Sequence, residues 1–208
     1  MIYRFALIAV AVLVAACSDP KVANEKNFKV AIQNYLDAVY PRCYFTEDFP
    51  ATISMFDARG AKATFKALTN AGLLSEKEEP HEVTEIFGRK KVVVQPTFHL
   101  TEEGKKFYKT DAVKTLGGKT IGGFCLGKAT VKEVSQFSEP SDMFGQRISR
   151  VNYTYEVSGL PAWTKSSEIL SAISALKADV ESEKTPVKKL DALVLTNNGW
   201  VHEALFKK

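Results

Sequence analysis

Histidine is the side chain best suited to metal binding and to proton transfer near neutral pH, and the sequence contains three, His81, His99 and His202. None of them stands at a metal-ligand spacing from another histidine or from a cysteine. The acidic run at 76–79, with His81 after it, lacks the regularly spaced aspartates of a calcium loop. We therefore expect no metal site, and we interpret His202 as a structural or surface residue.

Gly117-Gly-Lys-Thr120 contains a Gly-Lys-Thr triplet of the kind found in phosphate-binding loops. The glycine that such a loop requires five residues before Gly118 is replaced by Val113, so we interpret these glycines as a turn. No serine stands in a Gly-x-Ser-x-Gly elbow, and the neighbouring Glu102 and Glu103 suit a helix amino terminus. The sequence therefore predicts neither catalysis nor a bound cofactor.

The composition is that of a globular protein, with 45% hydrophobic and 25% charged residues in 208. Its 28 basic and 24 acidic residues give a formal charge of +4. This excess is too small to indicate a nucleic-acid partner, and no basic stripe dominates the chain.

The amino terminus has the three parts of a secretory signal. Arg4 supplies a positive charge, 5–16 is an apolar run of twelve residues, and the small residues Ala15 and Ala16 precede Cys17. A transmembrane helix needs about 20 apolar residues, and Ser18-Asp19-Pro20 ends this run earlier. We therefore expect residues 1–16 to be removed.

Val14-Ala15-Ala16-Cys17 resembles the lipobox of bacterial lipoproteins, with valine at the position where leucine is usual. The resemblance implies a diacylglyceryl group on Cys17, cleavage after Ala16 and acylation of the new amino terminus, which together give a stable membrane anchor. Ser18, rather than an aspartate, follows Cys17, which favours the outer membrane facing the periplasm. The alternative is an ordinary secretory signal without lipid.

Once Cys17 is assigned to lipid, Cys43 and Cys125 remain as one candidate disulfide pair. The periplasm permits disulfides, and a bridge closing a loop of roughly 80 residues would stabilise the fold by about 4 to 5 kcal/mol. The alternative is two buried thiols that pack as small apolar side chains.

The elements that position these residues begin with a polar, lipidated tether at 17–24 and continue with a helical part. Apolar residues recur at three and four positions from Asn24 until Pro41 ends the helix, and a second helix is expected over 57–71. Residues 76–80 are interpreted as a charged turn.

Two segments, 65–74 and 98–107, together resemble the recognition-helix end and the wing of a winged-helix module. The second contains Leu100-Thr-Glu-Glu-Gly104, a phrase that follows the wing strand in such regulators. The resemblance covers residues 61–110 and implies a helical, winged-helix-like part over 25–116. It is weak evidence for DNA binding, because the signal sequence directs the chain away from DNA.

Residues 117–208 are expected to form an antiparallel β module with one packed helix. Apolar and polar residues alternate over 129–134 and 148–157, and helical spacing returns over 166–181. The segments 190–196 and 200–206 flank Asn198-Gly199, which indicates a hairpin. The predicted fold class is therefore α+β, and whether it has one core or two domains stays open.

Tyr153 and Tyr155 fall on one face of a predicted strand, and Trp163 follows Pro161 in a loop. Such aromatic residues can form a recognition surface, and the alternative is a sheet face packed on the helix at 166–181. These observations favour a non-catalytic envelope lipoprotein that binds a protein or cell-wall component. The alternatives are an envelope hydrolase or small-ligand carrier, and a structural role in envelope integrity.

Overall fold

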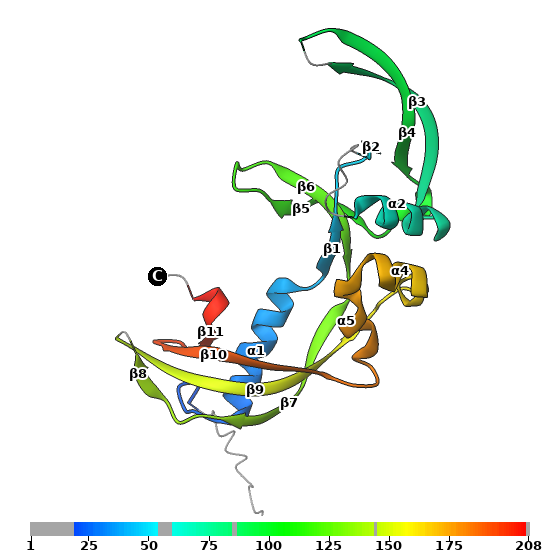
Figure 1. Ribbon diagram of the computed structural model, residues 1–208. Helices are drawn as coiled ribbons and strands as arrows, with labels where there is room; N and C mark the ends of the chain where they lie inside the picture. Colours follow the sequence, from blue (N-terminus) through cyan, green and yellow to red (C-terminus); the bar gives the residue numbers. More distant parts are fainter. Residues whose placement is uncertain (1–18, 54–59, 85–86, 144, 207–208) are drawn as a thin grey trace, which may run out of the picture.

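The computed structural model describes residues 19–53, 60–84, 87–143 and 145–206, which form two lobes (Figure 1). The predicted signal peptide, 1–16, and the predicted lipidation site, Cys17, lie outside the described residues. Within the described ranges the longest helix has 15 residues, and no helix combines the length and the hydropathy of a membrane span.

The first lobe, which we call the helix–sheet lobe, consists of one helix and an antiparallel sheet. Its elements are α1 (Glu25–Val39), β7 (Lys128–Phe137), β8 (Ser141–Met143), β9 (Gln146–Ser158), β10 (Val187–Thr196) and β11 (Gly199–His202). The strand order is β11-β10-β9-β7, and β8 pairs with β9. The sheet curves around α1, which contacts both of the outer strands, β7 and β11 (Figure 1). The lobe is therefore a half-barrel whose open side is covered by a helix.

Helix α1 begins where the side chain of Asn24 accepts a hydrogen bond from the Asn27 amide at 2.8 Å. One face carries Phe28, Ile32 and Leu36, all buried against the concave face of the sheet. Each such side chain contributes about 2 kcal/mol by leaving water. Gln33 adds direction to this packing, because its amide group bonds the Ala129 carbonyl at 3.0 Å and the Val131 amide at 2.9 Å on β7.

The segment before α1, residues 19–24, is packed against the same lobe although a tether was predicted at 17–24. Trp200 Nε1 donates to the Lys21 carbonyl at 3.1 Å, and Asn27 Nδ2 donates to the Asp19 carbonyl at 2.9 Å. Pro20 lies against Gly199, where a Cβ would approach it to 3.0 Å and φ is +114°. The hairpin glycine thus has a second role as a seat for the amino-terminal segment.

The second lobe, which we call the two-sheet lobe, carries the remaining elements around a separate apolar cluster. They are β1 (Arg42–Thr46), β2 (Ala51–Thr52), α2 (Ala61–Asn70), β3 (Leu74–Thr84), β4 (Lys90–Leu100), α3 (Glu102–Lys105), β5 (Tyr108–Lys114), β6 (Thr120–Leu126), α4 (Ser167–Ala172) and α5 (Lys177–Glu181). Its sheets have the orders β1-β6-β5 and β2-β4-β3. Strand β6 passes through Gly127 into β7 and so connects the lobes, as does the step from α1 to β1.

Strands β3 and β4 extend from this lobe as a protruding hairpin, which we call the arm (Figure 1). Near its tip Phe87 is 94% exposed, and Val92 and Val94 are also exposed on β4. Pro80 pairs with Val94, and Pro96 pairs with a residue of β3 two positions from Pro80. A proline has no N–H to donate, so each of the two strands carries a residue that limits hydrogen bonding to a further strand, and β2 pairs with β4 only at Thr97 and Phe98.

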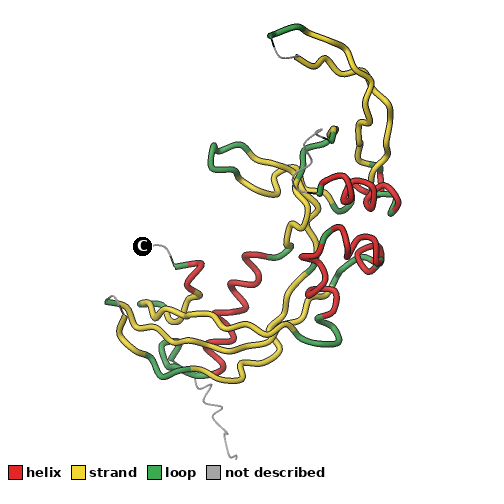
Figure 2. The backbone as a smooth tube through the Cα atoms, viewed as in Figure 1, coloured by secondary structure: helices red, strands yellow, loops and turns green. Residues whose placement is uncertain are grey.

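The predicted α+β fold class, with its helical, winged-helix-like part over 25–116, is wrong. Strands dominate this region and the whole chain, and α2 is a single helix beside two small sheets (Figure 2). The expected charged turn at 76–80 lies within β3, where each residue is paired with β4. Backbone pairing between two strands of eleven residues each outweighs the low strand propensity of glutamate, lysine and proline.

The expected helix over 166–181 is also not the helix that packs on the sheet. It is interrupted after α4 at Ile173, and its apolar residues Ile169 and Leu176 join the core of the two-sheet lobe. Helix α1 covers the sheet instead, because its apolar face is longer and unbroken. The predicted helix ending before Pro41 and the hairpin at Asn198-Gly199 are confirmed.

Candidate functional site

A cavity of about 320 Å³ lies between the carboxyl end of α1 and the concave face of the sheet. Its walls come from α1, from the start of β1, and from β9 and β10. The lining residues are Tyr35, Leu36, Val39, Tyr40, Arg42, Tyr153, Tyr155, Lys189 and Asp191. This volume is at the lower end of the range of small-ligand sites.

Strand β10 places charged side chains on the inner face of the sheet at this cavity. Lys189 is paired with Tyr153 and Asp191 with Val151, so all four residues stand on the concave face of the sheet, which α1 covers. Between them Leu190 faces outward and is 44% exposed. A half-buried strand normally has apolar residues inside and polar ones outside, and this stretch of β10 has the reverse order.

The carboxylate of Asp191 is held by its neighbours at the edge of the cavity. It accepts a hydrogen bond from the Tyr153 hydroxyl at 2.6 Å, and His202 Nε2 lies 3.2 Å from the same oxygen, Oδ2, without hydrogen-bond geometry. The Tyr35 ring stacks on His202 with centroids 3.6 Å apart. Because His202 Nδ1 accepts the Ala204 amide at 3.1 Å, the proton of a neutral imidazole is on Nε2, toward Asp191.

A second carboxylate, Asp179 on α5, is buried behind the cavity. The hydroxyls of Tyr40 and Tyr44 donate to its Oδ2 at 2.8 and 2.5 Å, and Arg42 lies 3.6 Å from it. Burial, together with the hydrogen bond to Asp179, raises the pKa of Tyr40 and of Tyr44 well above the ordinary value. Burial and Asp191 likewise raise the pKa of Tyr153. These hydroxyls therefore remain protonated donors at physiological pH.

The Cys43–Cys125 disulfide positions one wall of the cavity. The predicted bridge is present, with an S–S distance of 2.06 Å, and it joins directly paired residues of β1 and β6. Cys43 stands between Arg42 and Tyr44, so the bridge fixes the strand that presents both side chains to Asp179.

The aromatic residues selected from the sequence lie in two places. Tyr153 and Tyr155 share a face, as their spacing predicts, but they are buried and form part of the cavity wall beneath α1. Trp163 packs on Phe107 and Phe124 in the two-sheet lobe, where its buried Nε1 has no hydrogen-bond partner among the described residues. The three residues therefore do not form one surface.

Sequence reasoning did not select Arg42, Lys189 and Asp191. The signal for the last two was present, since the run Lys188-Lys-Leu-Asp191 places charges at both inward positions of a strand. Arg42 could not be found in this way, because its role depends on how β1 leaves α1.

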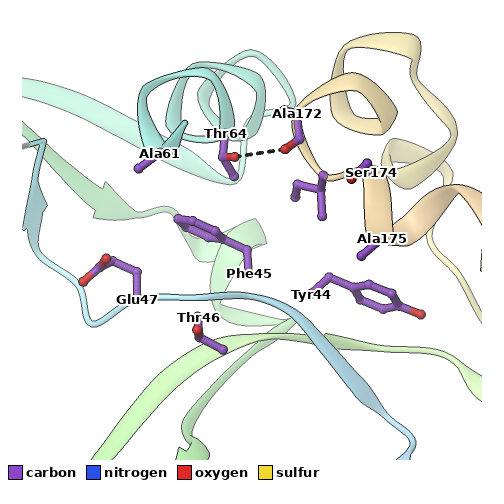
Figure 3. A pocket seen from close by; sticks show the side chains of 10 residues that line it. Tyr44, Phe45, Thr46, Glu47, Ala61, Thr64, Ala172, Ser174 and Ala175 are labelled. Atoms are coloured by element: carbon purple, nitrogen blue, oxygen red, sulfur yellow. Dashed lines mark hydrogen bonds between the residues drawn. The ribbon is translucent and has the colours of Figure 1, made fainter. Parts of the chain in front are cut away.

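A second cavity, of about 310 Å³, lies between β1, α2 and the segment after α4 (Figure 3). Its walls are mostly apolar or small, and Glu47 is its single charged lining residue. Thr64 spans it by donating to the Ala172 carbonyl at 3.3 Å (Figure 3). Within the described ranges no group of three or more His, Cys, Asp or Glu side chains is arranged to hold a metal ion. The cavity beneath α1 has the richer chemistry.

Comparison of the chain with models of known protein families, with curated proteins and with solved structures gave no significant match.

Proposed function

We propose that this chain is a lipid-anchored lipoprotein of the bacterial envelope that acts by binding, through the cavity beneath α1. The observation that carries the proposal is the reversed polarity of β10, where exposed Lys189 and partly buried Asp191 stand on the face toward the cavity and Leu190 stands on the outer face. Charged side chains are uncommon on the inner face of a sheet, so their presence beside a cavity favours a ligand site.

The lipobox at Val14–Cys17 supports the anchor, and its Ser18 favours the outer membrane facing the periplasm. In the periplasm, the ligand would be a protein or a component of the cell wall. The cavity volume of about 320 Å³ suits a small group of such a component and not a large surface.

Catalysis is the less favoured alternative. The His202–Asp191 pair resembles part of a hydrolytic triad, but its polar and stacking partners among the described residues are Tyr35, Tyr153 and Ala204. None of these is a serine or cysteine nucleophile.

The anchor is tested by the intact mass of the protein from separated membranes, compared with a Cys17→Ala variant. A native chain that begins at Cys17 and carries acyl mass supports the anchor. A chain that retains residues 1–16 without acyl mass contradicts it.

The binding site is tested by placing a photo-crosslinking amino acid at position 189 in cells, with position 188 as the control on the opposite face of β10. Crosslinks to an envelope component from position 189 but not from position 188 are expected. Equal crosslinking from both positions, or none, would remove the cavity from the proposal.

A further inference from the structure

The charged side chains at the cavity have opposite signs, and two of them, Lys189 and Asp191, have atoms without a partner in the described part of the chain. Lys189 lines the cavity, and its ammonium group has no ion-pair or hydrogen-bond partner among the described residues. Tyr153 and His202 both approach Oδ2 of Asp191. Its other oxygen, Oδ1, has no hydrogen-bond partner among the residues that the structure describes. The Asp191 side chain is 25% exposed at the cavity, so a ligand in the cavity can reach it.

A ligand with a single charge fits this arrangement poorly. An anion attracted by Lys189 and Arg42 would be repelled by Asp191, and a cation attracted by Asp191 would be repelled by the two basic side chains. A ligand that carries both charges satisfies all three groups.

The two charges of the ligand must also be close together. Residues 189 and 191 are two positions apart on one strand, which places their Cα atoms about 6.6 Å from each other. The aromatic walls formed by Tyr35 and Tyr155 leave an apolar surface for the uncharged part of the ligand.

We infer that the cavity binds an amino-acid head group, with the ligand carboxylate at Lys189 and the ligand ammonium at Asp191. This inference rests on the proposed binding function and specifies its ligand class. Such head groups occur in free amino acids and on cell-wall peptides whose side chains end in an unlinked amine and carboxylate.

Three related probes test the inference by calorimetry on the full-length chain in detergent. Diaminopimelic acid carries two amino-acid head groups, pimelic acid carries the carboxylates without the amines, and pentane-1,5-diamine carries the amines without the carboxylates. Binding of the first probe at least about 10-fold tighter than of the other two is expected, as for the loss of one charge-assisted hydrogen bond. Equal binding of pimelic acid or of the diamine overturns the inference.

Variants connect this binding to the named side chains. Lys189→Met and Asp191→Asn should each weaken binding of diaminopimelic acid about 10-fold or more, whereas Lys188→Met, on the outer face of the same strand, should leave it unchanged. An unchanged affinity in Lys189→Met overturns the inference. Co-sedimentation with purified cell walls, competed by free diaminopimelic acid, identifies the cell wall as the source, and its absence identifies a free amino acid.

Failure of the ligand class is distinguishable from failure of the binding function. If none of the three probes binds while position 189 still crosslinks, the amino-acid head group is excluded and the binding function stands. If neither is observed, both are excluded.

Discussion

Asp179 and Asp191 stand in two neighbouring clusters with the same chemistry and different exposure. Each carboxylate accepts a tyrosine hydroxyl and lies beside a group that can carry positive charge. Asp179 is 1% exposed, and the side chains of Tyr40, Arg42 and Tyr44 surround its Oδ2, whereas Asp191 is 25% exposed and, among the described residues, has only Tyr153 and His202 at its Oδ2. The comparison teaches that a fully buried acid surrounded by donors stabilises the fold, while an acid of the same chemistry that stays partly exposed at a cavity is available to a ligand.

The largest expected effect comes from removing the bridge that holds the Asp179 cluster together. Cys43→Ala combined with Cys125→Ala should lower the free energy of unfolding by about 4 kcal/mol, because the bridge closes a long loop. Urea denaturation of the full-length chain measures this, with Cys17→Ala as the control that leaves the bridge intact. A loss below about 1 kcal/mol would contradict the assigned role of the bridge.

Removing the buried carboxylate of Asp179 should have the next largest effect on stability. Asp179→Ala leaves Arg42 and the hydroxyls of Tyr40 and Tyr44 without their acceptor, and we expect a loss of about 3 kcal/mol in the free energy of unfolding. The same denaturation experiment measures it. A variant as stable as the unchanged chain would show that the cluster is not structural.

Alkaline pH should destabilise the cluster around Asp179 by deprotonating its tyrosines. The fold raises the pKa of Tyr40 and Tyr44 above the ordinary value of 10.0, so their contribution to stability is full below pH 10 and is lost as pH rises beyond it. Tyr44→Phe should flatten this decline by up to about 1.4 kcal/mol per pH unit. Urea denaturation midpoints, measured at steps of about half a pH unit between pH 9 and pH 11, give this slope. An unchanged slope in Tyr44→Phe would contradict the assignment.

The partly exposed carboxylate of Asp191 should contribute little to stability. Asp191→Asn keeps an oxygen that can accept the Tyr153 hydroxyl, so we expect a loss of about 1 kcal/mol or less in the free energy of unfolding. The denaturation midpoint checks this expectation. If the loss matched that of Asp179→Ala, the distinction between the two clusters would fail.

The smallest effect is expected on the arm. Val94→Thr replaces an exposed apolar side chain far from both carboxylates, and stability should change by no more than about 0.5 kcal/mol. Thermal denaturation measures it, with Val151→Thr, at a buried position of β9, as the comparison expected to lose more. A large loss from the exposed position would show that the arm packs against something.

The sequence allowed prediction of the elements whose signals are local. Asn24 and Pro41 delimit α1, and Asn198-Gly199 defines a hairpin. The long-range Cys43–Cys125 bridge is the exception, because assigning Cys17 to lipid leaves a single possible pair. The prediction failed where long-range pairing decides the structure. The strand at 74–84 is rich in glutamate and is extended because β4 pairs with it along its length.

The candidate site could be predicted only in part, for the same reason. Tyr153 and Tyr155 were found from their alternation, but the helix that covers them comes from the opposite end of the chain. No local pattern indicates that α1 packs there and not the segment at 166–181. The inward charges Lys189 and Asp191 become meaningful only when the concave face of the sheet is known.

The docked segment at 19–24 determines how the molecule would stand on a membrane. With acyl chains on Cys17, two residues before Asp19, at most about 7 Å of chain would separate the lipid from the folded protein. The arm lies at the opposite end of the molecule from this segment (Figure 1). The height of the arm tip above the bilayer would then be a fixed property of the fold, and each residue inserted between Ser18 and Asp19 would raise its upper limit by about 3.5 Å.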